Sequence, residues 1–404
     1  MGFGDLVKRS AASARGRARL RSAPFSSLVS PREPFDPPPV TVQPLLGPVE
    51  PVFRSRNGDE PTFRPTRAVG PLWRVTVVEN FRFPGIPLGW YTVATSKEVR
   101  AGQILTVKYF GEELVLYRTE SGEARLTGAY CPHLGAHLGS GSVEGENLRC
   151  GFHGFEFGGD GRCVKTAYGK GVPRKAKLAT WPLREHNGYI FAWYHPEGMQ
   201  PDWEVPVLPG PTEGWTSFST RTMEVNSHPQ ETSENSVDIG HFIQVHGFGG
   251  AWTEGDLEVD GHLLKGAYGI QYPLGSKLRF VAKFRVEVHG LGYSLVRVSI
   301  ERFGIEINLL VLSSPVDQGK IILRTASSVK QVGVPPIAHL VRSAATWGLN
   351  REVGQDAPIW ETKRYVEKPI LAEGDGPIGE YRRYCKQFYV EKRPKPAQLP
   401  VVAA

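Results

Sequence analysis

Apolar and polar residues alternate along two separate stretches of the chain, with the period of two that is typical of strands. The first stretch contains four short runs rich in β-branched and aromatic residues, at positions 90–94, 103–109, 113–118 and 188–194. Phe110-Gly111-Glu112 stands between two of these runs and predicts a hairpin turn. We therefore expect a small all-β domain over residues 85–200.

The second stretch holds longer alternating runs, at positions 278–288, 293–300, 305–312 and 321–328. Helical patterns stand before and after this group, near residues 231–246 and 335–365. Because these strands and helices do not alternate strictly, the pattern indicates an α+β layout. We expect a second domain over residues 205–393, reached through a proline-bounded linker at residues 196–211 and followed by a tail at residues 394–404.

Charge is concentrated at the start of the chain. Residues 1–84 are predicted to be an extension, and within residues 1–30 six Lys and Arg residues stand against one acid, so that this segment carries +5 of the formal net charge of +7. A proline-rich stretch follows at residues 31–65. A solvated tail, a transit-like peptide and a polybasic tether to a membrane surface or nucleic acid all fit the basic segment. Since the remaining chain is nearly neutral, we expect no nucleic-acid partner.

Apolar runs and cysteines narrow the class of protein further. No apolar run approaches about 18 residues, so we expect no transmembrane segment. A signal-peptide h-region is not visible either, so secretion is not expected. Four cysteines in 404 residues argue against a disulfide scaffold and fit a reducing compartment. We therefore expect a cytoplasmic protein.

Cysteine and histidine recur in one pattern. Cys131 and His133 form a C-x-H unit, and after sixteen intervening residues Cys150 and His153 form a C-x-x-H unit. Such ligands fit either a tetrahedral Cys₂His₂ zinc site or a Rieske [2Fe–2S] cluster, in which two cysteines bind one iron and two histidines the other. The C-x-H spacing departs from that of common zinc sites, and the neighbouring glycines allow the backbone to approach bridging sulfides. We therefore predict a Rieske cluster.

A second constellation, N-x₂-D-x₂-H-x₄-H, runs from Asn235 through Asp238 and His241 to His246. Two neutral imidazoles and one carboxylate bind Fe(II) on one face and leave positions open for O₂. Asp238 and His241 are three residues apart, so Asp238 is placed to orient a histidine. His241 and His246 are five apart, about 140° around a regular helix, so both reach one ion only if the helix ends or distorts. Gly247 makes that ending credible.

Together the two motifs resemble those of Rieske-type non-heme iron oxygenases over residues 90–389. Within that family the chain is similar to the cholesterol 7-desaturases of the Neverland type and to the oxygenase component of 3-ketosteroid 9α-hydroxylase. Residues 131–139, residues 188–195 and Glu234-Asn235 resemble the desaturases, and residues 376–389 are similar in both groups. In two respects the chain departs from its relatives. The membrane-anchoring N-terminal helix of animal desaturases is not apparent, and Phe155 stands where many relatives have tryptophan.

The resemblance implies an all-β Rieske domain followed by an α+β helix-grip domain, an antiparallel sheet with long helices. It places a third iron ligand, an aspartate, on the long C-terminal helix, where Asp356 matches; Asp317 in a turn and Glu352 are the rivals. It also implies that electrons come from NAD(P)H through a separate reductase and ferredoxin, since the chain has no GxGxxG unit or flavin fingerprint of its own.

In this family an electron crosses a subunit interface within a head-to-tail homotrimer, a closed heterologous ring. The resemblance therefore gives Asp238 a catalytic role as the bridge between a cluster histidine and an iron histidine, and groups Asn235 with it. The implied reaction uses O₂ to hydroxylate or desaturate a hydrophobic ring substrate, with a sterol or steroid favoured. The alternatives are hydroxylation or demethylation of an aromatic, alkaloid or other secondary metabolite, and a plain electron carrier with an inert second domain.

Overall fold

The computed structural model describes residues 83–390 except 170, 275–277 and 332. The basic segment, the proline-rich stretch and the C-terminal tail expected from the sequence lie outside these residues. Of the helices in the described part of the chain, none combines the length and the apolar content needed to span a bilayer.

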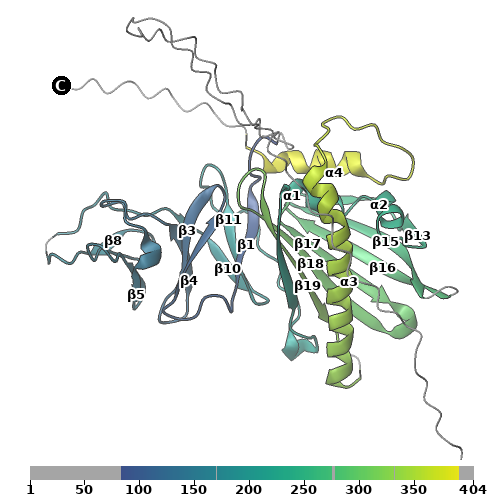
Figure 1. Cartoon of the computed structure of the whole chain (residues 1–404), viewed down its shortest axis with the longest axis horizontal. Helices are drawn as coiled ribbons and strands as arrows, with labels where there is room; N and C mark the ends of the chain where they lie inside the picture. The colour runs from purple at the N-terminus through teal and green to yellow at the C-terminus, as the bar shows by residue number, and fades with distance from the viewer. Residues whose placement is uncertain (1–82, 170, 275–277, 332, 391–404) are drawn as a thin grey trace, which may run out of the picture. The chain divides into compact units, whose positions relative to one another are not determined.

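Three small antiparallel sheets make up the first part of the described chain (Figure 1). Their strand orders are β1-β11-β10, β2-β3-β4-β9 and β5-β6-β7-β8. The predicted hairpin turn joins β2 to β3 through Phe110 and Gly111, whose φ angles of 59° and 79° are those of a two-residue primed turn. The elements are β1 (Gly89–Thr95), β2 (Ile104–Tyr109), β3 (Glu112–Arg118), β4 (Ala124–Gly128), η1 (Leu138–Ser140), β5 (Ser142–Glu144), β6 (Asn147–Arg149), β7 (Glu156–Phe157), β8 (Cys163–Lys165), β9 (Thr180–Trp181), β10 (Leu183–His186) and β11 (Tyr189–Tyr194).

One large antiparallel sheet dominates the second part, in the order β12-β19-β18-β17-β16-β15-β13, with β14 paired to β15. The four long runs expected from the sequence are strands β16 to β19. The strands are β12 (Ser219–Val225), β13 (Gly250–Thr253), β14 (Glu258–Asp260), β15 (Leu263–Leu274), β16 (Leu278–His289), β17 (Tyr293–Ile300), β18 (Ile305–Pro315) and β19 (Ile321–Val329). The helices are η2 (Pro211–Glu213), α1 (Pro229–Glu234), α2 (Gly240–Gln244), η3 (Glu301–Phe303), α3 (Pro335–Thr362), α4 (Ile378–Cys385) and η4 (Lys386–Phe388).

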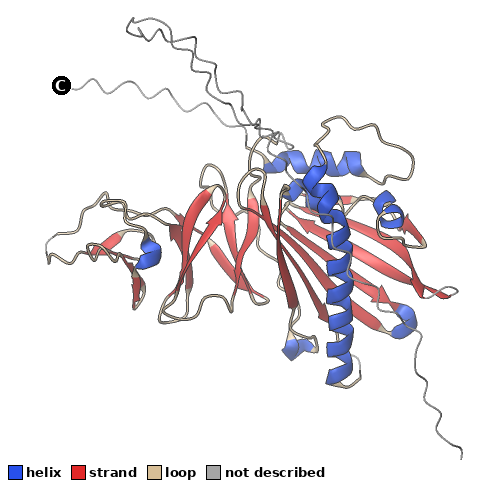
Figure 2. Ribbon diagram, in the orientation of Figure 1, coloured by secondary structure: helices blue, strands red, loops and turns tan. Residues whose placement is uncertain are grey.

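The long helix α3 covers one face of this sheet, as Figure 2 shows. Its buried side chains, Leu349, Val353 and Trp360, pack against Val225 of β12 and Leu323 of β19. Burying this apolar stripe holds the helix on the sheet, because each buried aliphatic side chain contributes about 1.5–3 kcal/mol of transfer free energy. The all-β sheets followed by a helix-covered antiparallel sheet confirm the predicted fold class.

The helical pattern near residues 231–246 was predicted as one element, and this was wrong in detail. The structure has two short helices, α1 and α2, with a break at residues 235–239. In the break the N–H of Ile239 donates to the carbonyl of Asp375 at 3.3 Å, so a distant segment supplies the acceptor. Gly376 lies so close to Val237 that a Cβ at Gly376 would come within 2.3 Å of the Val237 carbonyl oxygen. The C-terminal part of the chain therefore occupies the gap.

Residues 375–389, the C-terminal strap, hold α1 in place. Arg382 binds both carboxylate oxygens of Glu234, at 2.7 and 3.1 Å, a bidentate contact between two mostly buried groups. The hydroxyl of Tyr381 donates to the carbonyl of Gln230 at 2.7 Å, and the hydroxyl of Tyr389 donates to the Gln230 side chain at 2.8 Å. The strap thus fixes the helix that leads into the second sequence motif.

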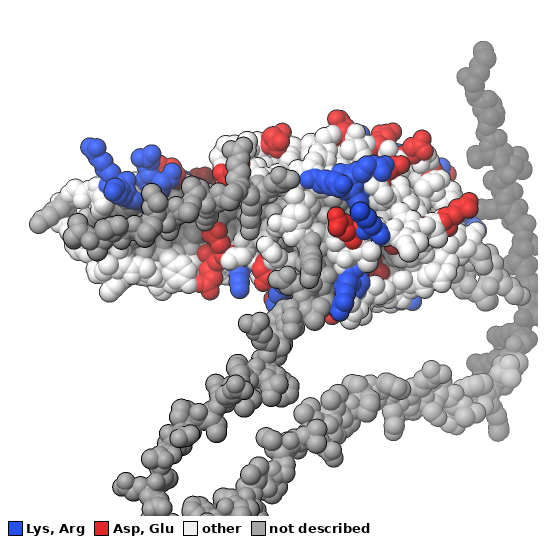
Figure 3. Space-filling view, turned by 90° about the horizontal axis from the view of Figure 1, so that it is seen from above, with Lys and Arg blue, Asp and Glu red and all other residues white. Residues whose placement is uncertain are grey.

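Lys and Arg side chains and Asp and Glu side chains both appear on the face of the described chain that Figure 3 shows. Two bidentate ion pairs of the described chain join Arg118 to Glu185 and Arg184 to Glu204. Opposite charges at this spacing compensate one another locally, and each exposed pair contributes at most about 1 kcal/mol to stability.

Candidate functional site

The two cysteine–histidine loops close in the same way. In each, the N–H of the cysteine, Cys131 or Cys150, donates to the carbonyl five residues on at 2.8 Å. In each, the glycine four residues after the cysteine donates back to its carbonyl, Gly135 at 2.9 Å and Gly154 at 3.1 Å. Both glycines have positive φ, 75° and 63°, which disfavours other residues there. The loops are therefore equivalent turns, each presenting one cysteine and one histidine.

The two thiols interact with each other, and the two imidazole rings are neighbours. The cysteines are buried, and burial together with the neighbouring Cys150 raises the pKa of the Cys131 thiol. The rings of His133 and His153 lie 4.8 Å apart, and the His133 ring stacks on Phe155 at 4.4 Å. The buried Nδ1 of His133 has no hydrogen-bond partner within the described chain. A buried thiol at Cys131 that resists ionisation and the unpaired nitrogen of His133 fit an iron–sulfur cluster, because positively charged irons would stabilise the thiolate.

The predicted iron residues His241, His246 and Asp356 come together from distant parts of the chain. Their ligand atoms all lie within 4.8 Å of one another. Nε2 of His246 is 3.6 Å from Oδ1 of Asp356, and the two imidazole rings are 5.0 Å apart. Nδ1 of His241 is buried and has no hydrogen-bond partner among the described residues. Two imidazoles and one carboxylate at this separation fit a divalent iron with positions left open.

The local backbone explains how two histidines five residues apart can meet. Helix α2 carries His241 and ends at Gln244. Gly247, at a φ of 71°, donates to the carbonyl of Ile243 at 3.2 Å, and the N–H of Phe248 donates to the carbonyl of Phe242, also at 3.2 Å. This is a glycine-ended helix cap. It supplies the helix ending that the histidine spacing requires, and His246 lies beyond the last helical turn.

Polar neighbours hold the carboxylate and one imidazole in position. The amide of Asn235 donates to Oδ2 of Asp356 at 3.0 Å, and the indole of Trp360 contacts the Asn235 carbonyl oxygen at 3.4 Å. Nδ1 of His246 donates to the side-chain oxygen of Gln355 at 3.1 Å, which leaves its Nε2 lone pair free. Sequence reasoning missed Gln355 and Trp360. Their positions in the sequence could have identified them, because both stand about one helical turn or less from Asp356 on the same helix.

Burial sets the electrostatics of the group. It raises the pKa of Asp356 to about 6, against the opposing effects of His241 and the Asn235 hydrogen bond. Burial also raises the pKa of Glu352, one turn earlier on α3, to about 7, with Asp356 adding to the shift. It lowers the pKa of His246. Without a metal, the buried site therefore favours a protonated carboxyl group and a neutral imidazole. A bound divalent cation would favour the ionised carboxylate beside the neutral imidazole.

Asp238 lies at the edge of this group. Its Oδ1 accepts the N–H of His241 at 3.2 Å and is 3.6 Å from Nδ1 of the same residue. Burial acts to raise the pKa of Asp238, but the contacts with His241 outweigh it and lower the pKa. A third of the side chain, 34%, is exposed.

Of the two rivals for the third ligand, Asp317 lies in the turn between β18 and β19, and Glu352 is outside the group of three.

A cysteine–histidine cluster module and a two-histidine, one-carboxylate group in one chain define an oxygenase with two iron centres. Comparison with known families agrees. Residues 89–182 match the Rieske [2Fe–2S] domain, and residues 192–389 match the C-terminal domain of 3-ketosteroid 9alpha-hydroxylase. The chain belongs to the Rieske-type oxygenases, so it is an oxidoreductase, and its cofactors are a Rieske [2Fe–2S] cluster and a mononuclear iron. The zinc and plain electron-carrier alternatives are thereby excluded.

Similar proteins belong to both groups that the sequence resembles, the cholesterol 7-desaturases and the 3-ketosteroid 9α-hydroxylase oxygenase components. The chain is 29% identical to cholesterol 7-desaturase of Caenorhabditis elegans, covering 77% of this chain and 79% of the relative. It is 30% identical to a 3-ketosteroid-9-alpha-monooxygenase oxygenase component of Rhodococcus rhodochrous, covering 75% and 84%. Among solved structures, Pseudomonas putida CBB5 NdmA with caffeine matches with a TM-score of 0.60 at 19% identity, over 74% of this chain and 89% of that one. This last likeness concerns the fold alone.

Proposed function

We propose that this chain is the terminal oxygenase of an electron-transfer system and that it hydroxylates or desaturates a sterol or steroid. Electrons enter at the cluster held by Cys131, Cys150, His133 and His153, in a domain over residues 85–200. Oxidation takes place in a domain over residues 205–393, at the iron held by His241, His246 and Asp356. The observation that carries the proposal is the convergence of these last three side chains to within 4.8 Å.

A row of aromatic rings supports a long, flat, apolar substrate. From His246, the ring of Phe248 is 5.5 Å away, that of Tyr272 a further 4.4 Å, that of Phe280 a further 5.4 Å, and that of Phe303 a further 5.8 Å. Phe303 is 46% exposed, so the row leads from the iron group to the surface. Ligand sites of this kind are mostly apolar with few polar groups. The names of the two relatives point to sterol and steroid substrates, which are apolar ring systems.

The chain's own residues prepare the reaction by fixing the donor atoms. Gln355 fixes the tautomer and the ring orientation of His246, and Asn235 holds the Asp356 carboxylate. When bound, the mononuclear iron supplies O₂ chemistry, while the cluster supplies electrons singly. The rings of Phe242 and Phe248 lie beside the two histidines and make part of the site apolar. These contacts let the protein keep two neutral imidazoles and one carboxylate aimed at one point.

The proposed reaction needs partner proteins that supply the electrons. A ferredoxin, an NAD(P)H-dependent reductase or both would deliver electrons, and the name of the Rhodococcus relative, an oxygenase component, supports a system of several proteins. All four cysteines are unpaired, which suits a reducing compartment such as the cytoplasm.

Exposed apolar side chains around the cluster support a homotrimer. Leu134 is 67% exposed, Phe152 64% and Tyr130 53%. We call the surface formed by these three residues the tip. Large apolar side chains gathered on one such surface favour a protein interface. We expect this tip to meet the iron domain of a second copy, where the exposed edge of Asp238 links a cluster histidine to an iron histidine.

Substitution at the tip tests the homotrimer. Leu134→Asp is expected to lower the molar mass measured by light scattering toward that of one subunit. Val207→Asp is the matched control, because Val207 is 70% exposed but lies in the linker away from the cluster loops. Equal masses for the two variants would contradict the proposed contact.

Turnover assays test the reaction. The full chain, supplied with a surrogate reductase and ferredoxin, is assayed on cholesterol, 3-ketosteroids and 4-methylsterols, with products identified by mass spectrometry. Asp356→Ala is expected to abolish oxidation while leaving the Rieske EPR signal intact, and Asp317→Ala is expected to retain oxidation. No turnover of any sterol or steroid would reject the substrate class, and an active Asp356→Ala variant would reject the ligand assignment.

A further inference from the structure

A cavity opens between the ends of β1 and β11 and the start of β12. Its volume is about 510 Å³, within the range of small-molecule sites. It is bounded by the end of β1, the β10–β11 turn, the linker at residues 209–211 and the start of β12. None of the cluster or iron residues named above is among the described residues that line it. The reaction proposed above therefore assigns no role to the residues that line this cavity.

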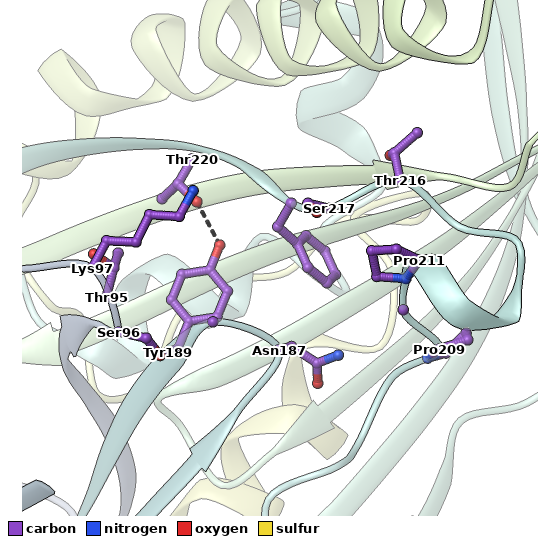
Figure 4. Close-up of a pocket in the computed structure, with 13 residues that line it drawn as sticks. Thr95, Ser96, Lys97, Asn187, Tyr189, Pro209, Pro211, Thr216, Ser217 and Thr220 are labelled. Atoms are coloured by element: carbon purple, nitrogen blue, oxygen red, sulfur yellow. Dashed lines mark hydrogen bonds between the residues drawn. The ribbon is translucent and has the colours of Figure 1, made fainter. Parts of the chain in front are cut away.

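Hydrogen bonds fix the walls of this cavity. The side chain of Asn187 both donates to the carbonyl of Leu208 at 2.6 Å and accepts from its N–H at 3.0 Å. The hydroxyls of Tyr189 and Thr220 lie 2.6 Å apart and join β11 to β12 (Figure 4). A cavity held by such contacts is preformed, so a ligand loses little affinity to ordering the protein.

The lining combines apolar rings with a single charge. The half-buried ring of Phe218 and the buried ring of Tyr189 stand 6.1 Å apart. Lys97 is exposed and forms no ion pair with a carboxylate in the part of the chain that the structure describes. The described lining contains no aspartate or glutamate, whereas Thr95 and Ser96 add hydroxyl groups beside the lysine. Figure 4 shows the ammonium of Lys97 near the Tyr189–Thr220 contact.

We propose that this cavity is a binding site for a small aromatic carboxylate of one or two rings. The rings lie against Phe218 and Tyr189, and the carboxylate meets the Lys97 ammonium and the hydroxyl of Thr95. Apolar walls supply most of the affinity, and the single cation selects an anion over an uncharged ring of the same shape. Because the site bridges β11 and β12, its occupant would also stabilise the junction of the two parts.

Isothermal titration of the full, metal-loaded chain with 2-naphthoate tests the site, with 2-naphthalenemethanol as the uncharged probe. We expect one saturable site that prefers 2-naphthoate. Lys97→Met is expected to weaken 2-naphthoate about three- to fivefold and to leave 2-naphthalenemethanol unchanged. Lys108→Met, at an exposed lysine on β2 outside the cavity, is the matched control and is expected to change neither. Phe218→Ala is expected to weaken both probes about three- to tenfold.

The iron site is the competing location for the probe. His246→Ala removes a predicted iron ligand but lies outside the cavity, so 2-naphthoate binding is expected to persist in it. Loss of binding in His246→Ala would place the probe at the iron and overturn the proposal. The absence of a saturable site would do the same, as would equal binding of the two probes or binding that neither Lys97→Met nor Phe218→Ala weakens.

Discussion

Asn235 offers the sharpest test of how the iron group is built, because its side-chain hydrogen bonds within the described chain go to the carboxylate and to an indole. The substitution Asn235→Ala removes the 3.0 Å hydrogen bond to Oδ2 of Asp356. A hydrogen bond to a charged acceptor contributes about 1.5–3 kcal/mol. Since about 1.4 kcal/mol is a factor of ten, the affinity for Fe(II) is expected to fall about ten- to a hundredfold, as is usual when a partner of a metal ligand is lost.

The same substitution has a pH signature. The Asn235 hydrogen bond lowers the pKa of Asp356, which burial has raised to about 6. Its loss moves that pKa further up, so a larger share of the carboxyl is protonated at pH 6 and cannot bind metal. The loss of affinity is therefore expected to be greater at pH 6 than at pH 8. Competition against a calibrated chelator at both values measures it, with the Rieske EPR signal as an internal reference.

Asn350→Ala is the matched control. Asn350 is also a hydrogen-bonded asparagine, on α3 itself, but its side chain contacts Thr325 and Thr346 and not the carboxylate. It is expected to leave Fe(II) affinity unchanged. The reasoning is refuted if Asn235→Ala binds Fe(II) as tightly as the parent, or if Asn350→Ala weakens binding as much.

Three further outcomes are expected. Asp356→Asn should stabilise the metal-free chain above pH 6 by about 2–3 kcal/mol, because a folded pKa of about 6 against an ordinary 3.8 costs stability as pH rises through that window; thermal unfolding should show the gain vanishing near pH 4. Gly154→Ala should lose more cluster iron and sulfide than Gly135→Ala, since both have positive φ but only at Gly154 would a Cβ crowd its neighbours, Ala167 at 3.0 Å and Arg149 at 3.1 Å. A chelator that removes the mononuclear iron should stop substrate oxidation while the Rieske EPR signal stays, and added Fe(II) should restore turnover.

The strands and α3 could be predicted from sequence because alternation and helical periodicity are local properties. Each long alternating run expected in the second domain is a strand, and α3 spans residues that the helical tract contained. The break between α1 and α2 could not be predicted in the same way. It depends on Asp375 and Gly376, more than a hundred residues further on, which supply the hydrogen-bond acceptor and the close contact.

The residues of the candidate site also differ in whether a local sequence pattern identifies them. The predicted cluster residues and the two predicted iron histidines stand in compact motifs, so spacing and residue type are enough to select them. Asp356 required the family resemblance, because one acid on a long helix has no local signal. Sequence reasoning misses Gln355 and Trp360 because their function lies in contacts with His246 and Asn235, and such contacts exist only once α3 is packed beside these two residues. Their roles, like those of the ligands, stay predictions for experiment.

The C-terminal strap has a consequence for how the protein is made in the cell. Every residue of both cluster loops has left the ribosome well before the strap is synthesised, whereas α1 and the break after it depend on Asp375, Gly376 and Arg382. At about 5–20 residues per second, these two events are separated by tens of seconds. The cluster module can thus receive its cofactor on the nascent chain, but the mononuclear iron can be captured only after translation is almost complete. A ribosome stalled before residue 375 should carry a chain with a Rieske signal and no second iron.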